Sequence, residues 1–85
     1  METPFYRYAL MRNFIRECLE QEKISEFIEE RFRTDPQMRE RFCSEDREEL
    51  KELVEDVVNY IAGKGKGREE EVLNALSSAC RGNST

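Results

Sequence analysis

Apolar residues recur every three or four positions along each long segment of the chain, which is the spacing of one face of an α-helix. Thr3 and Pro4 predict the start of the first helix, because a threonine side chain caps a first turn well and proline is tolerated at the first helical position. The apolar residues that follow cover an arc of about 180°. We expect this helix to end at about residue 21.

A second apolar stripe, Ile24, Phe27, Ile28 and Phe32, also has helical spacing, but its centre is rotated by about 110° from that of the first. One straight helix cannot turn both stripes toward the same core. We therefore predict a break near Glu22–Lys23.

Short polar segments mark the remaining boundaries. Asp35 before Pro36 predicts the end of one helix and the cap of the next. Ser44 is expected to cap a fourth helix, whose apolar stripe spans about 140° and which Gly63 ends. We predict an all-α fold, a compact bundle of four to five short helices at about 4–21, 24–33, 36–43, 45–62 and 69–80. Residues 1–82 are predicted to form a single helical domain, followed by a frayed tail at 83–85.

The chain of 85 residues is strongly charged, with 39% charged side chains and a net charge of −5. An acidic protein does not attract nucleic acid or an anionic membrane non-specifically, so basic proteins are its natural long-range partners. No apolar run reaches the roughly 20 residues that cross a bilayer, so no membrane contact is expected. The three cysteines are odd in number and widely spaced, which favours reduced thiols and an intracellular location, cytoplasmic or nuclear.

The only glycine-rich stretch is "IAGKGKGREEEV", residues 61–72, in which Lys64 and Lys66 alternate with glycines. A phosphate-binding loop would need the spacing GxxxxGK[ST], which is missing. Three glutamates in the first turn of the next helix would also repel a phosphate from the helix N-terminus. We interpret the stretch as a hinge between two helices.

Residues typical of catalysis or metal binding are scarce. The chain has no histidine, which removes the usual general base. It also has no nucleophile motif, no CxxC pair and no EF-hand spacing. We expect no enzymatic activity, no cofactor and no metal ion.

The fourth helix carries an acidic face opposite its apolar stripe. Like charges at helical spacing repel one another, at a cost of a few tenths of a kcal/mol per pair. This face is either a solvated surface or a docking strip for a basic peptide, a basic protein face or the arginines of the chain itself. Its proposed partner-binding residues are Glu48, Glu52, Glu55 and Asp56.

The first helix has a wider apolar arc than a surface helix of a small bundle needs, and two aromatic residues lie just outside that arc. Either the helix is central and contacts several others, or part of its aromatic face is exposed to a partner helix or a second copy. The second interpretation assigns partner contacts to Phe5, Tyr6, Tyr8 and Met11.

Arginines gather in the segment "RFRTDPQMRERF", residues 31–42. Its helix, turn and short helix have the outline of a helix-turn-helix. In that arrangement the side chains that would contact a groove of the nucleic acid are Arg31, Arg33, Gln37, Arg39 and Arg41. The shortness of the third helix and the acidity of the chain count against nucleic-acid binding. We prefer an arginine patch that pairs with the acidic strip, in the same chain or in a second copy.

Together these patterns predict a non-catalytic protein–protein interaction module, an acidic helical adaptor or regulatory subunit. Its partner would be another protein with a basic or apolar docking surface, and self-association is compatible with the same residues. A small helix-turn-helix-like nucleic-acid-binding regulator that uses the Arg31–Arg41 segment is the alternative. A structural subunit of a larger assembly is a third class.

Overall fold

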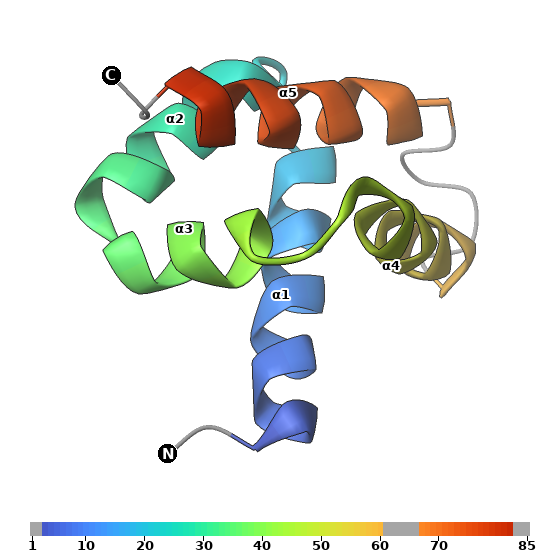
Figure 1. Ribbon diagram of the computed structural model, residues 1–85. Helices are drawn as coiled ribbons and strands as arrows, with labels where there is room; N and C mark the ends of the chain where they lie inside the picture. The colour runs from blue at the N-terminus through green and yellow to red at the C-terminus, as the bar shows by residue number, and fades with distance from the viewer. Residues whose placement is uncertain (1–2, 61–66, 83–85) are drawn as a thin grey trace.

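Five helices make up the described part of the chain, which is residues 3–60 and 67–82 of the computed structural model. They are α1 (Pro4–Leu19), α2 (Ile24–Thr34), α3 (Pro36–Cys43), α4 (Arg47–Tyr60) and α5 (Glu69–Gly82) (Figure 1). No strand occurs among the described residues, so the predicted all-α bundle is confirmed. The expected frayed tail at 83–85, the end of the fourth helix at Gly63 and most of the proposed hinge lie outside the described residues.

The helix boundaries follow from local capping chemistry. Thr3 Oγ1 accepts a hydrogen bond from the Tyr6 N–H at 3.1 Å, and Asp35 Oδ1 accepts one from the Met38 N–H at 3.2 Å. Both caps were predicted and precede a proline at the first helical position. The predicted Ser44 cap of α4 is wrong, because Asp46 Oδ1 accepts the Glu49 N–H at 2.9 Å. Ser44 instead closes the end of α3.

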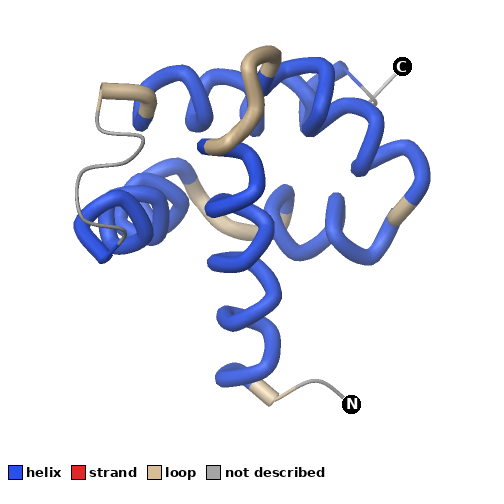
Figure 2. The backbone as a smooth tube through the Cα atoms, turned by 180° about the vertical axis from the view of Figure 1, so that it is seen from behind, coloured by secondary structure: helices blue, strands red, loops and turns tan. Residues whose placement is uncertain are grey.

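Helix α1 runs through the middle of the bundle and contacts each of the other four helices. In Figures 1 and 2 its C-terminal half lies among them, whereas its N-terminal half extends away from the body of the molecule. Helix α5 packs against α2 and α4. The interpretation of a central helix therefore holds for the C-terminal half of α1, and the aromatic residues of its N-terminal half are exposed.

The centre of the core is an aromatic cluster that joins three helices. The Phe14 ring of α1 lies 5.6 Å from Phe27, 5.9 Å from Phe32 and 5.4 Å from Phe42, measured between ring centroids. Phe14, Phe32 and Phe42 are buried, and Phe27 is half-buried against them. Apolar residues of α4 and α5 complete the core: Leu50, Leu53, Val54, Val57, Val58, Val72, Leu73, Ala75, Leu76 and Ala79.

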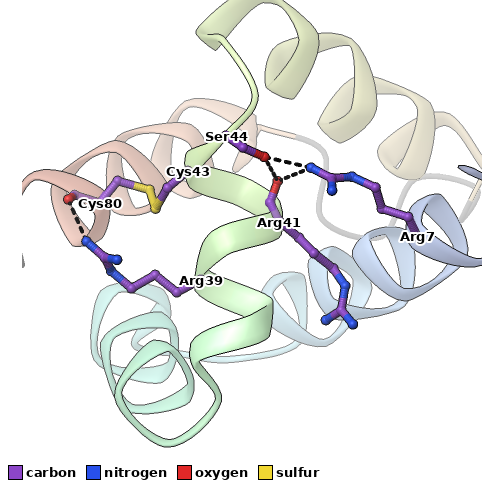
Figure 3. The surroundings of a disulfide bond; sticks show 6 residues. All are labelled: Arg7, Arg39, Arg41, Cys43, Ser44 and Cys80. Atoms are coloured by element: carbon purple, nitrogen blue, oxygen red, sulfur yellow. Dashed lines mark hydrogen bonds between the residues drawn. A yellow bond between two sulfur atoms is a disulfide. The ribbon is translucent and has the colours of Figure 1, made fainter. Parts of the chain in front are cut away.

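The expectation of three reduced cysteines is wrong, because Cys43 and Cys80 form a disulfide (Figure 3). It ties the end of α3 to α5 across 37 residues of chain. Sequence spacing could not show this pairing, since the two residues meet only after the helices pack. The intracellular location inferred from reduced thiols loses its basis, because disulfides persist mainly in oxidising compartments.

Cys18 is the one free cysteine among the described residues, and it is fully buried in the core. Burial raises the pKa of its thiol to about 12, with Glu17 adding to the effect and Arg31 opposing it. The thiol therefore stays protonated at neutral pH and behaves as a small apolar side chain.

Arg68, just before α5, fastens the loop between α1 and α2. Its guanidinium donates hydrogen bonds to the carbonyl oxygens of Leu19 at 3.1 Å and Gln21 at 2.7 Å. A third bond, at 3.4 Å, reaches the Glu22 carbonyl. These carbonyls lie at and beyond the C-terminal end of α1, where a positive charge also meets the negative end of the helix dipole.

We expect Phe14→Ala to lower the free energy of unfolding by about 3–5 kcal/mol, because it removes the ring that joins α1 to α2 and α3. Phe5→Ala is the matched control, since Phe5 is 90% exposed and its loss should change stability by less than about 0.5 kcal/mol. Urea denaturation of both variants measures the difference. Equal losses in the two variants would contradict the central role of Phe14.

We expect replacement of both bridged cysteines, Cys43→Ser with Cys80→Ser, to lower the free energy of unfolding by about 2–4 kcal/mol, through the added entropy of the unfolded chain. A reductant should destabilise the wild-type protein by a similar amount and leave the double variant unaffected. Urea denaturation with and without reductant tests this. Thiol titration of the unfolded wild-type protein should find one thiol per chain, and a count of three would contradict the bridge.

Candidate functional site

The exposed large hydrophobic side chains of the described residues all lie on α1 or α4. Phe5 is 90% exposed, Tyr6 56% and Tyr8 39% on α1, and Tyr60 is 89% exposed at the end of α4. Tyr8 and Tyr60 each line a groove between the two helices, whereas Phe5 and Tyr6 line neither groove. We call the angle between α1 and α4 the α1–α4 corner.

One groove of about 510 Å³ lies in this corner, and we call it the acidic groove. It brings together Tyr8 of α1 and Glu52 and Asp56 of α4, three residues that the sequence assigned to partner binding. The rest of its lining is Arg12, Glu45, Glu49, Leu50 and Leu53. An aromatic ring and two leucines thus line the groove beside a cluster of carboxylates.

A second groove, of about 670 Å³, lies against the C-terminal part of α4, and we call it the arginine groove. It shares Arg12 and Asp56 with the acidic groove, so the two are neighbours within one corner. Its further lining residues are Ala9, Asn13, Arg16, Val57, Asn59 and Tyr60. Arg12 and Arg16 make no ion pair with any described residue.

Arg7 joins α1 to the C-terminal end of α3 and to the loop that precedes α4. Its Nη2 atom lies 2.7 Å from Ser44 Oγ, 3.0 Å from the Arg41 carbonyl oxygen and 3.0 Å from Glu45 Oε2. Figure 3 shows Arg7 and Ser44 meeting at that carbonyl. Hydrogen bonds of charged groups stabilise by about 1.5–3 kcal/mol, and these hold the projecting part of α1 at a fixed angle to α4.

The carboxylates of the acidic groove repel one another. The pKa of Glu49 is raised above its ordinary value, first by a hydrogen bond with Glu45 and then by the negative charges of Glu45 and Asp46. Glu45 is neutralised by Arg7, but Glu52 and Asp56 have no ion pair among the described residues. No basic residue occupies the last turn of α4. Arg12, which also lines the groove, offsets only part of this charge, so the groove keeps a net negative charge.

The other predicted contact residues are placed differently. Met11 is fully buried in the core, so it cannot touch a partner, and its assignment to the contact surface is wrong. The apolar stripe of α1 included it correctly, but the spacing alone did not show which part of that stripe was covered. Glu48 and Glu55 are exposed on α4, yet they line neither groove.

Sequence reasoning missed Arg7, Arg12 and Arg16 as members of the corner. A signal for two of them was present, because Phe5, Ala9, Arg12 and Arg16 fall on one stripe of α1 at helical spacing. The role of Arg7 had no such signal, since its partners lie more than 30 positions away.

The arginines proposed for nucleic acid are engaged within the chain. Arg31 pairs with Glu17 and stacks over the Phe14 and Phe27 rings, and Arg33 pairs with Glu30. Arg41 is only 8% exposed. Arg31, Arg33 and Arg39 make no ion pair with the acidic strip of α4 among the described residues, so for these three the preferred pairing within one chain is not found.

Arg39, the remaining arginine of the segment, is also engaged within the chain. Its Nη2 donates to the Cys80 carbonyl at 3.3 Å, on the other side of α3 from Arg7 (Figure 3). Its Nε is buried without a hydrogen-bond partner among the described residues. Of the five residues proposed for nucleic acid, only Gln37 is an exposed side chain without an interaction inside the described chain. The nucleic-acid alternative thus loses most of the basic face on which it depended.

Neither a metal centre nor a membrane span is found among the described residues. No group of three or more Cys, Asp or Glu side chains there is arranged to hold a metal ion. No helix in the described ranges combines the length and the hydropathy that a bilayer crossing requires.

Comparison with models of protein families, with curated proteins and with solved structures finds no match to this chain. The function is therefore argued from the α1–α4 corner alone.

We expect Glu49→Gln to raise the melting temperature at pH 7, because it removes one charge from a repelling cluster. A carboxyl whose pKa is raised in the folded state favours folding when it is protonated, and that contribution is lost as the pH rises through the folded pKa. The gain should therefore shrink as the pH falls through the raised pKa of Glu49. Thermal melts at several pH values measure it.

Glu48→Gln is the matched control, since Glu48 lies beside Glu49 in the first turn of α4 and has the same relation to the helix dipole. If both variants gained equally at pH 7, the repulsion would not be specific to the acidic groove.

Proposed function

We propose that the chain is a non-catalytic protein–protein interaction module, an adaptor or regulatory subunit that binds through the projecting end of α1 and the acidic side of α4. The observation that carries the proposal is the acidic groove, where Tyr8 lies beside Glu52 and Asp56. Phe5 and Tyr6 are exposed in the first turn of the same helix.

The exposed aromatics supply the apolar part of the surface. Covering a fully exposed phenylalanine side chain contributes about 1.5–3 kcal/mol, and Phe5 makes almost none of its possible contacts in the free chain. Aromatic residues at the centre of an interface often dominate its energy. Because Arg7 already holds α1 at its angle to α4, little ordering is needed on binding.

The carboxylates define the chemistry of the partner. Glu48, Glu52, Glu55 and Asp56 are exposed on α4 and make no ion pair with a described residue. A protein surface that offers lysine or arginine beside an apolar patch would relieve their repulsion, and complementary charge would also speed its approach. Cys18, the free thiol among the described residues, is buried and protonated, so it adds no reactive group to this surface.

A photo-crosslinking amino acid placed at position 5, and separately at position 52, tests the proposal. Both positions should crosslink to the same protein, because both belong to one surface. The identified protein should then bind the purified chain, and Phe5→Ala with Tyr6→Ala should weaken that binding by at least about tenfold.

Position 29 on α2 is the matched control for the crosslinker, since Glu29 is exposed and makes no ion pair with a described residue. A crosslink of equal strength from position 29 would indicate capture by proximity. Absence of any specific crosslink from positions 5 and 52 would overturn the proposal. Binding of an identified protein that the aromatic substitutions leave unchanged would also overturn it.

A further inference from the structure

We propose that the partner of the α1–α4 corner is a second copy of this chain, which binds it as a symmetric dimer. This inference rests on the proposed function, because it names the occupant of the same surface. The two grooves of the corner share Arg12 and Asp56, and the remaining charged residues are carboxylates in the acidic groove and Arg16 in the arginine groove.

The unpaired charges of the corner are divided between its two grooves. Glu49 and Glu52 line the acidic groove, and Arg16 lines the arginine groove with Arg12 at the shared edge. None of the four has an ion pair with a described residue. A surface with both signs left unpaired side by side is complementary to itself.

A two-fold axis makes use of that complementarity twice. In an isologous interface the same patch meets itself, so each contact is repeated by symmetry. An axis at the shared edge of the two grooves would exchange them. Arg12 and Arg16 of one copy would then face Glu49 and Glu52 of the other, and the reverse. No heterologous partner is required to satisfy these charges.

The projecting end of α1 supplies the apolar contact of such a dimer. Phe5, Ala9, Arg12 and Arg16 lie on one stripe of α1, with the small Ala9 between the ring and the guanidinium groups. Two α1 helices that cross near Ala9 in antiparallel orientation would place Phe5 of each copy near Arg12 of the other. An arginine over an aromatic ring is a favourable pair. The exposed Tyr60 borders the same groove.

The net charge of −5 per chain opposes dimerisation at long range. At about 150 mM salt the screening length falls to about 8 Å, so this repulsion weakens, while close pairs in a partly covered interface are screened less. The test is therefore placed at that ionic strength.

Sedimentation equilibrium of the full chain, over protein concentrations up to about 1 mM, measures the dimer. Two charge-reversal variants follow from the geometry: Arg12→Glu with Arg16→Glu, and Glu49→Arg with Glu52→Arg. We expect the wild-type protein to dimerise and each variant alone to bind itself at least about tenfold more weakly. An equimolar mixture of the two should form a heterodimer, because the exchange restores opposite charges at both contacts.

Single reversals outside both grooves, Glu29→Arg on α2 and Lys51→Glu on α4, are the matched controls and should dimerise like the wild-type protein. Circular dichroism checks that every variant is folded, and the mixture shows that the weakened variants keep a competent surface.

A wild-type chain that stays monomeric over the whole range would overturn the inference, as would a dimer that is indifferent to all four reversed charges. The failure of the inference differs from that of the proposed function. A monomeric chain that crosslinks from positions 5 and 52 to a different protein rejects only the second copy as partner. A chain with neither a dimer nor a specific crosslink rejects both.

Discussion

The Phe14 ring lies within 5.9 Å of the rings of Phe27, Phe32 and Phe42, so one side chain joins α1 to α2 and α3. A chain of 85 residues has few large apolar side chains, and a domain of this size has a small margin of stability. Concentrating the rings of three helices around Phe14 commits the C-terminal half of α1 to the core. Phe5 and Tyr6, near the start of α1, stay exposed among the described residues. One end of α1 thus lies in the core, while its aromatic end is exposed.

Arginine hydrogen bonds join the helices of this strongly charged chain, and their placement leaves the surface charge unevenly distributed. Arg7 holds the junction of α3 and α4, Arg68 holds the carbonyls after α1, and Arg39 reaches the Cys80 carbonyl. Arg47 joins α4 to α5 through Asn74 and Ser77. Guanidinium groups suit this work because they present several donors in a fixed plane. Since so many cations are used between helices, the surplus carboxylates remain on α4. Glu48, Glu52, Glu55 and Asp56 make no ion pair among the described residues, which supports the proposal that they meet a partner.

Local patterns in the sequence were enough to predict the helices, whereas contacts between distant segments were not. The predicted break between α1 and α2 and the predicted caps at Thr3 and Asp35 were correct. Each of these features depends on neighbours within about four positions. Ser44 was a plausible cap by the same rules, but its hydroxyl is used by Arg7 and Arg41, which only the fold brings near. The Cys43–Cys80 bridge and the role of Arg68 likewise join segments 37 to 49 positions apart. Of the predicted site, Tyr8, Glu52 and Asp56 converge, while Met11 shows that periodicity identifies a face without showing how far along the helix the face is covered.

The position of the corner relates binding to stability. Helix α1 belongs to the core at one end and to the candidate site at the other, and Arg7 lies between the two. The acidic groove places Tyr8 beside like charges, an arrangement that lowers the stability of the free chain. A surface that only had to be soluble would gain by mixing its charges along α4. Carboxylates held together beside the aromatic residues of α1 repel one another, which lowers the stability of the free chain. A group of opposite charge would relieve this repulsion. The arrangement supports the proposal that this surface binds a partner.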